Sequence, residues 1–285
     1  MSLTEILRTG LDHEIASFIP KPDIGSYNNC PAPPRTQNYA LVGTAFDYLL
    51  RLELKRRNPR AVEGEYTAVL AYNLIKNGVL ALGTACFNNT CVDEAEFEYV
   101  KLVARDFFAE REKFLQTGQL TDALIIAIIK FARLDQVYRA LIYDNTREVD
   151  PADIEDMKAL YALVPPELKR PMYPVFLNPD FTTPNLAADP DLILEDALID
   201  IKTVKRMEVS DYYWSQVVSY LALADWLREH EKRNLPRINR IGLYFARFGV
   251  IWTTRAEPIR ANPYFERLKR AIAEGHLNAR PERAF

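Results

Sequence analysis

The stretch ADPDLILEDALIDIKTVK, residues 188–205, sets carboxylates and ammonium groups among apolar side chains. Asp200 and Lys202 stand two residues apart inside the run LIDIK, whose aliphatic character favours a buried strand. Charges are costly to bury without partners, so this strand needs a chemical reason to carry them. Carboxylate oxygens are preferred ligands of Mg²⁺, and a nearby ammonium can stabilise charge developing on a phosphate. The stretch therefore indicates metal-dependent phosphate chemistry.

A hairpin with a two-residue turn at 195–196 would bring these charges together. In that register Asp191 faces Asp200, and Asp189 faces Lys202, across two antiparallel strands. One face of the hairpin then collects only apolar side chains, and the other collects the charged ones. A slip of one residue would turn the charges into the core, so the segregation favours this register.

Two directly opposed carboxylates repel each other. A divalent cation between Asp191 and Asp200 removes the repulsion, and Lys202 would then stabilise the transition state or orient the attacking water. The alternative is an exposed sheet face on which Asp189 and Lys202 form a cross-strand ion pair. That alternative leaves the opposed carboxylates unexplained, so we predict a site for Mg²⁺ or Mn²⁺.

These residues resemble the signature of the PD-(D/E)XK nuclease superfamily. Pro190-Asp191 matches the first element of the signature, and Asp200-Ile201-Lys202 matches the second. Further along, Gln216 and Tyr220 are similar to the Gln-xxx-Tyr element of RecB-like members, and their i, i+4 spacing puts them on one helical face. The resemblance implies that both support the site or position the strand; alternatively, they cap the edge of the core.

An upstream segment, VGTAFDYLLR, is similar to the first RecB-like motif, in which a metal-binding histidine or acid follows a glycine by four residues. Gly43 and Asp47 occupy those positions. The resemblance implies that Asp47 is a third metal ligand, and the open alternative is an i, i+4 ion pair with Arg51. Some RecB-like nucleases carry a four-cysteine iron–sulfur cluster, but no cysteine follows Cys91 here, so we expect none.

The elements around these motifs indicate an α/β (α+β) fold. Helical or extended patterns fall at 43–57 (helix), 64–163 (mostly helix), 172–181 (extended), 210–231 (helix), 240–255 (strands) and 263–273 (helix). The resemblance implies a restriction-endonuclease-like mixed central sheet flanked by helices. We predict a single nuclease domain over 1–285, with its core at about 39–60 and 171–285 and a large helical insertion at 61–170.

Composition excludes several other classes. Three unpaired histidines argue against histidine-rich zinc chemistry and Ser-His-Asp catalysis, and three cysteines are expected to be reduced thiols of a cytoplasmic protein. The longest apolar run, 123–129, is too short for a membrane span, and no secretory signal is visible. A net charge of −3 still permits a local basic groove. The predicted nucleic-acid contacts, whose alternative is solvated surface, are Lys205, Arg206, Arg228, Lys232 and Arg233.

The sequence thus predicts a Mg²⁺- or Mn²⁺-dependent DNA nuclease of exonuclease type. The predicted catalytic set is Asp191, Asp200, Lys202, Gln216 and Tyr220, and the predicted metal ligands are Asp47, Asp191 and Asp200. Two alternatives stay open. The fold could serve as a non-catalytic nucleic-acid-binding or interaction subunit of a repair or restriction complex, or the helical block could be the working part of a scaffold. The oligomeric state is left open.

Overall fold

The computed structural model describes residues 2–275 of the 285-residue chain, in two compact units. The first unit comprises the described parts of Met1–Cys30, Ala61–Gly64 and Met172–Phe285, and the second comprises Pro31–Arg60 and Glu65–Pro171. This grouping differs from the predicted boundaries, which put 39–60 with the sheet.

The first unit is built on a six-stranded mixed sheet. Its strands, in spatial order, are β1 (Val62–Glu63), β4 (Val175–Leu177), β5 (Leu192–Leu194), β6 (Ala197–Lys202), β7 (Arg240–Phe245) and β8 (Val250–Arg255). The pairs β1–β4 and β6–β7 are parallel, and the other three pairs are antiparallel. The chain is therefore a mixed α/β protein with a mixed central sheet flanked by helices, which confirms the predicted class.

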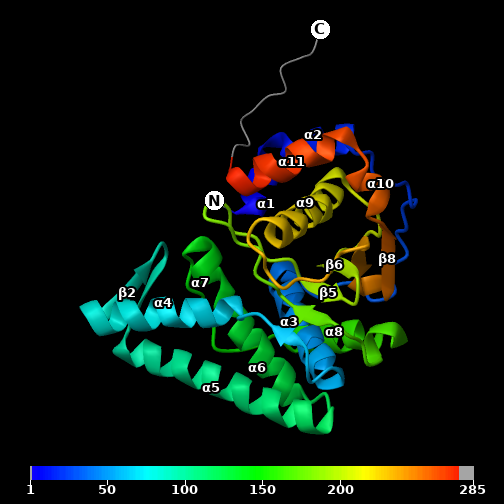
Figure 1. Ribbon diagram of the computed structural model, residues 1–285. Helices are drawn as coiled ribbons and strands as arrows, with labels where there is room; N and C mark the ends of the chain where they lie inside the picture. The colour runs from blue at the N-terminus through cyan, green and yellow to red at the C-terminus, as the bar shows by residue number, and fades with distance from the viewer. Residues whose placement is uncertain (1, 276–285) are drawn as a thin grey trace. The chain divides into compact units, whose positions relative to one another are not determined.

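A long helix, α9 (Asp211–Glu229), makes the crossover between the parallel strands β6 and β7. Its N-cap Ser210 accepts a hydrogen bond from Tyr213 N–H, as helix starts require. Two further helices, α2 (Asp12–Phe18) and α11 (Pro263–Glu274), pack against α9 (Figure 1). The shorter elements of this unit are α1 (Leu3–Ile6), a π-helical turn (Leu7–Leu11), a 3₁₀ turn (Ala246–Phe248) and α10 (Glu257–Arg260).

The hairpin of β5 and β6 has the predicted register. Leu192 pairs with Ile199 and Leu194 pairs with Ala197, so residues 195–196 form the turn, in which Glu195 adopts a positive φ of 58°. The face that carries the charges is nevertheless a core face, because Ile193 on that face packs into the apolar cluster around α9. The charges occupy one end of a covered face, where α9 supplies polar partners.

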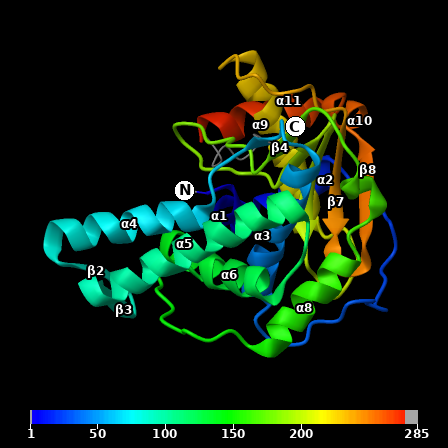
Figure 2. The same ribbon diagram turned by 90° about the horizontal axis from the view of Figure 1, so that it is seen from below.

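The second unit is mainly helical. Its elements are α3 (Tyr39–Arg57), α4 (Thr67–Leu82), β2 (Thr84–Phe87), β3 (Thr90–Asp93), α5 (Glu94–Thr117), α6 (Asp122–Arg133), α7 (Asp135–Ala140), α8 (Pro151–Ala162) and a 3₁₀ turn (Pro166–Lys169). Here α3 packs against α5, α6 and α8 (Figure 2). Apolar side chains spread over much of the surface of α3, and burying them among these helices explains why 39–57 groups with this unit.

The β2–β3 hairpin lies at the end of α4 and was missed by the sequence analysis (Figure 2). Cys86 and Cys91 are direct cross-strand partners and are joined in a disulfide. The expectation that both are reduced thiols is therefore corrected. The pairing was hidden because the segment reads as part of a continuous helical block, and only a hairpin turn at 88–89 makes the two residues opposite neighbours.

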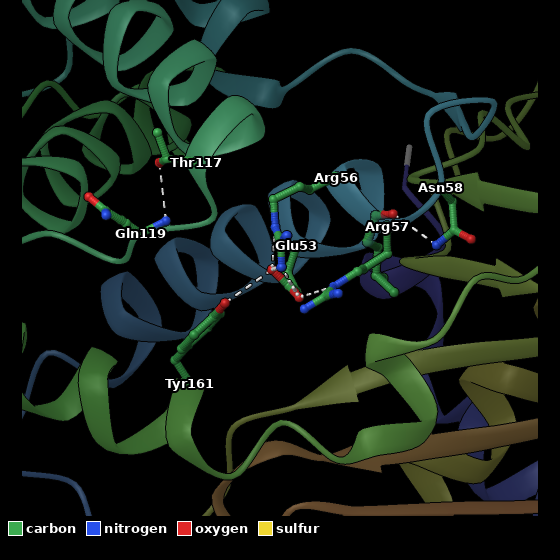
Figure 3. A network of polar contacts seen from close by, with 8 residues as sticks. Glu53, Arg56, Arg57, Asn58, Thr117, Gln119 and Tyr161 are labelled. Atoms are coloured by element: carbon green, nitrogen blue, oxygen red, sulfur yellow. Dashed lines mark hydrogen bonds and ion pairs between the residues drawn. The ribbon is translucent and has the colours of Figure 1, made fainter.

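The basic run at the end of α3 is tied to a buried carboxylate. Glu53 is fully buried and accepts hydrogen bonds from Arg56 and Arg57, and Tyr161 Oη donates to it from α8 at 3.0 Å (Figure 3). The two cations satisfy the charge that burial would otherwise make costly. Part of this basic run thus holds the helical unit together.

Candidate active site

Asp200 and Lys202 form an ion pair along a single strand. Residues i and i+2 of a strand share a face, so both side chains point toward α9 from the end of β6. Asp200 is only 3% exposed, and its Oδ2 lies 2.5 Å from Lys202 Nζ. The lysine is therefore paired with the aspartate of its own strand.

A polar chain runs from Lys202 into α9. Lys202 Nζ donates to Gln216 Oε1 at 2.8 Å, Gln216 Nε2 donates to Tyr220 Oη at 3.2 Å, and Tyr220 Oη donates to the backbone oxygen of Asp189 at 3.4 Å. The i, i+4 pair therefore lies on one helical face, as predicted. These contacts fix the direction of the amide, because its oxygen must face the ammonium. Gln216 and Tyr220 are buried, so they hold Lys202 from the interior side of the site.

The second predicted acid, Asp191, reaches the same strand end. Its Oδ2 accepts a hydrogen bond from the backbone N–H of Ile201 at 2.5 Å, just beyond the end of the β5–β6 ladder at Leu192 and Ile199. The charges of Asp191 and Asp200 both act on Lys202 and on Tyr220. The two predicted acids, the lysine and the Gln-Tyr pair are thus gathered at one end of the hairpin.

The electrostatics keep Lys202 charged. Burial disfavours the ammonium, but the adjacent carboxylates of Asp200 and Asp191 outweigh burial and raise the pKa of Lys202 above its ordinary value. Burial, reinforced by the same two carboxylates, raises the pKa of the Tyr220 hydroxyl well above its usual range. At neutral pH the lysine is therefore a cation and the tyrosine a neutral hydroxyl. Tyr213, three residues before Gln216, adds an aromatic ring 4.6 Å from Lys202 Nζ.

The donor set fits a hard divalent cation in part. Among residues 2–275, no group of three or more His, Cys, Asp or Glu side chains is arranged to hold a metal ion. However, Asp200 Oδ2 is buried against the Lys202 ammonium. None of the described residues donates a hydrogen bond of standard geometry to it. Mg²⁺ is often held by one or two carboxylates with water and phosphate oxygens, and Asp191 and Asp200 are the candidate carboxylates for that mode.

The third predicted ligand, Asp47, lies on α3 in the second unit. Within that unit its Oδ2 is 3.9 Å from Arg51 Nη1, which is the i, i+4 ion pair held open as the alternative. The guanidinium of Arg51 also stacks on the Tyr66 ring at 4.0 Å. A metal-binding role for Asp47 stays a prediction.

The predicted nucleic-acid contacts fall at two ends of the sheet. Lys205 and Arg206 follow β6 directly and are exposed beside the Asp200–Lys202 end. Arg228 lies about 18 Å further along α9 than Gln216, at 1.5 Å per residue. Arg233 is engaged in holding a loop, since its guanidinium donates to the backbone oxygens of Asp180 and Thr182. Lys232 precedes Arg233 in the segment between α9 and β7. A role for Arg228, Lys232 and Arg233 in binding DNA stays a prediction.

Sequence reasoning missed Tyr213 and the engagement of Arg233. The first had a signal, because a residue three before Gln216 shares its helical face. The second had none, because its partners lie some fifty residues away in the chain.

No family model, curated protein or solved structure matches the chain. No helix among residues 2–275 is both long and apolar enough to cross a membrane.

Proposed function

We propose that this chain is a Mg²⁺- or Mn²⁺-dependent nuclease that hydrolyses phosphodiester bonds in DNA, of the restriction-endonuclease-like, RecB-like exonuclease type. The observation that carries the proposal is the buried Asp200–Lys202 pair, with Asp191 beside it and Gln216 and Tyr220 beneath it. Hydrophobic residues of similar volume often replace a buried ion pair without loss of stability, so packing alone gives little reason for the pair.

The roles follow from charge and position. Asp191 and Asp200 would hold the divalent ion, which supplies positive charge against the phosphate and lowers the pKa of water. Lys202 remains protonated, because the raised pKa of its ammonium prevents it from accepting a proton at neutral pH. As a cation it would stabilise negative charge on a phosphate oxygen or orient the attacking water.

Gln216 and Tyr220 are positioning residues. The amide oxygen of Gln216 holds the ammonium of Lys202, and the tyrosine hydroxyl holds the amide nitrogen. A charged side chain kept in one geometry by such contacts needs little reorganisation when charge develops on the substrate. The chain from Lys202 to Tyr220 thus favours a preorganised cation facing the substrate.

A second function is favoured by one observation. Asp200 and Lys202 already neutralise each other, and among residues 2–275 no three-residue metal cluster is present. This arrangement suits a non-catalytic nucleic-acid-binding or interaction subunit that keeps the charged pair without a metal ion.

Isothermal titration with Mn²⁺ separates the two functions. The parent chain is expected to bind Mn²⁺, and Asp200→Asn is expected to lose that binding. Asp196→Asn is the matched control, because Asp196 lies at the turn of the same hairpin and pairs with Arg240. Binding by the parent and the control, but not by Asp200→Asn, supports the nuclease. Equal titration of all three variants contradicts it.

A further inference from the structure

The disulfide between Cys86 and Cys91 lies on the solvent face of the β2–β3 hairpin. Its two residues are direct cross-strand partners, and both are exposed. The neighbouring cross-strand pair, Ala85 and Val92, points to the opposite face and is buried. The bond is therefore separate from the buried side of the hairpin and is open to a reductant in solution.

The disulfide closes a short loop. Cys86 and Cys91 are five positions apart in the sequence, and a disulfide stabilises a fold less when the loop that it closes is short. The hairpin also packs closely on α4 through its buried side, because a Cβ atom at Gly78 would lie 2.7 Å from Ala85 Cβ. Breaking the bond should therefore leave the helical unit folded.

The turn of this hairpin holds residues 141–147, the α7–α8 segment. Asn88 N–H donates to the backbone oxygen of Leu141 at 2.9 Å. Asn89 Nδ2 donates to the backbone oxygen of Tyr143 at 3.2 Å, and Asn89 Oδ1 accepts from the backbone N–H of the same residue at 3.3 Å. Both asparagines lie between the two bonded cysteines in the chain, so the disulfide restrains the turn from both sides.

The α7–α8 segment begins at a residue in an unfavourable backbone conformation. Leu141 has a φ of +53°, in the left-handed region that bulky side chains rarely adopt, and it is 49% exposed. Such a conformation persists only where neighbours hold it, and Asn88 supplies one of the hydrogen bonds that do so. The chain is therefore expected to relax at Leu141 when the turn loosens.

Side chains from two helices hold the rest of the α7–α8 segment. Glu96, in the first turn of α5, accepts hydrogen bonds from Tyr143 Oη and from the guanidinium of Arg147. Arg133, at the end of α6, donates to the backbone oxygen of Thr146 at 2.7 Å. The segment is thus ordered by contacts from the hairpin turn, α5 and α6, and loosening the turn removes the first of these supports.

We propose that Cys86 and Cys91 form a reversible redox site, at which a dithiol reductant opens the disulfide and so releases the α7–α8 segment from the hairpin turn. A thiolate of the reductant attacks one sulfur and forms a mixed disulfide, and the other cysteine leaves as a thiolate. The second thiol of the reductant then attacks the mixed disulfide. The reductant becomes a disulfide, and the protein gains two electrons and two protons as two thiols. The proposal is independent of the proposed nuclease function.

The experiment compares the full-length parent before and after treatment with dithiothreitol. Thiol titration without denaturant should rise by two per chain, and oxidised glutathione should reverse the rise. For proteolysis, both samples are alkylated and desalted before trypsin is added. Cleavage after Arg147, read by mass spectrometry, should be about 10-fold faster in the reduced protein, the effect of losing one or two hydrogen bonds. Cleavage after the exposed Lys205, in the first unit, should not change.

Variants test the path from the disulfide to the segment. The double variant Cys86→Ser with Cys91→Ser should be cleaved after Arg147 at the fast rate with or without dithiothreitol. Asn89→Ala should also be cleaved fast while its disulfide stays intact, because it loses both contacts with the α7–α8 segment. Asn77→Ala is the matched control, an exposed asparagine of α4 in the same unit, and should be cleaved like the parent.

Each part of the proposal has a contrary result. If dithiothreitol exposes no further thiols until urea is added, or if the new thiols do not rejoin, the redox site is overturned. An unchanged rate of cleavage after Arg147 in the reduced parent, or in Asn89→Ala, overturns the release of the segment. Thermal melting by circular dichroism checks the fold of the reduced parent. Loss of the folded state on reduction would also contradict the proposal, because the bond would then be a structural staple.

Discussion

Replacing Lys202 with methionine isolates the buried charge of Asp200. Methionine keeps most of the length and apolar stem of lysine but removes the ammonium that lies 2.5 Å from Asp200 Oδ2. The aspartate stays almost completely buried, so its ionised form loses the neighbour that balances it. Removing one partner of a buried ion pair typically costs about 3–5 kcal/mol of stability. We expect a loss of that order in the free energy of unfolding.

The loss should depend on metal. Without the ammonium, the buried Asp200 carboxylate has no counter-charge beside it. Mn²⁺ should restore part of the lost stability in urea unfolding, because the two carboxylates then regain a counter-charge.

Lys269→Met provides the control for this prediction. Lys269 is also buried and donates to Glu229 at 2.8 Å and to Glu266 at 3.0 Å, but both carboxylates are more than half exposed. Water can solvate those carboxylates when the lysine is lost, so the cost should stay near 1 kcal/mol or below. If Lys202→Met is as stable as Lys269→Met and indifferent to Mn²⁺, the reasoning about the buried pair is refuted.

Three further predictions concern single side chains. Burial raises the pKa of Asp135 to about 7 despite hydrogen bonding from Tyr48. The protonated carboxyl therefore contributes fully to the free energy of unfolding below about pH 4, and this contribution is lost as the pH rises to 7. Asp135→Asn should remove this pH dependence, of a few kcal/mol, in chemical unfolding. Tyr220→Phe should cost about 1 kcal/mol in chemical unfolding and slow cleavage, because the hydroxyl no longer accepts from Gln216. Arg206→Ala should lower DNA affinity and its salt dependence in anisotropy titrations, whereas Arg233→Ala should chiefly lower the melting temperature.

Much of the fold could be predicted because its signals are local. The hairpin register followed from segregating charged and apolar residues in one short stretch, and Leu192 pairs with Ile199 as that segregation requires. The helix predicted over 210–231 corresponds to α9, whose N-cap is Ser210. The β2–β3 hairpin was lost inside a helical region, because neither strand exceeds four residues. The grouping of α3 depends on long-range packing that its own pattern does not specify.

The grouping of the candidate site residues was also predicted in part. Residue types and spacing identified Asp191, Asp200 and Lys202, because opposed carboxylates beside a lysine need an explanation. The ion pair between Lys202 and Asp200 was missed, because the sequence pattern offered Asp189, on the neighbouring strand, as the partner of Lys202. Arg233 owes its place to contacts made far along the chain, and no local pattern signals such contacts.

Cleavage of end-labelled single-stranded, duplex and circular DNA in Mg²⁺ or Mn²⁺ tests the central claim most directly. The parent and Asp196→Asn are expected to cleave, whereas Asp200→Asn and Lys202→Ala should each be slower by about 100- to 1000-fold. Survival of the circular substrate would identify the exonuclease type. If Asp200→Asn and Lys202→Ala cut DNA as fast as the parent, or if the parent cuts none of the substrates with either metal, the account of this site is contradicted.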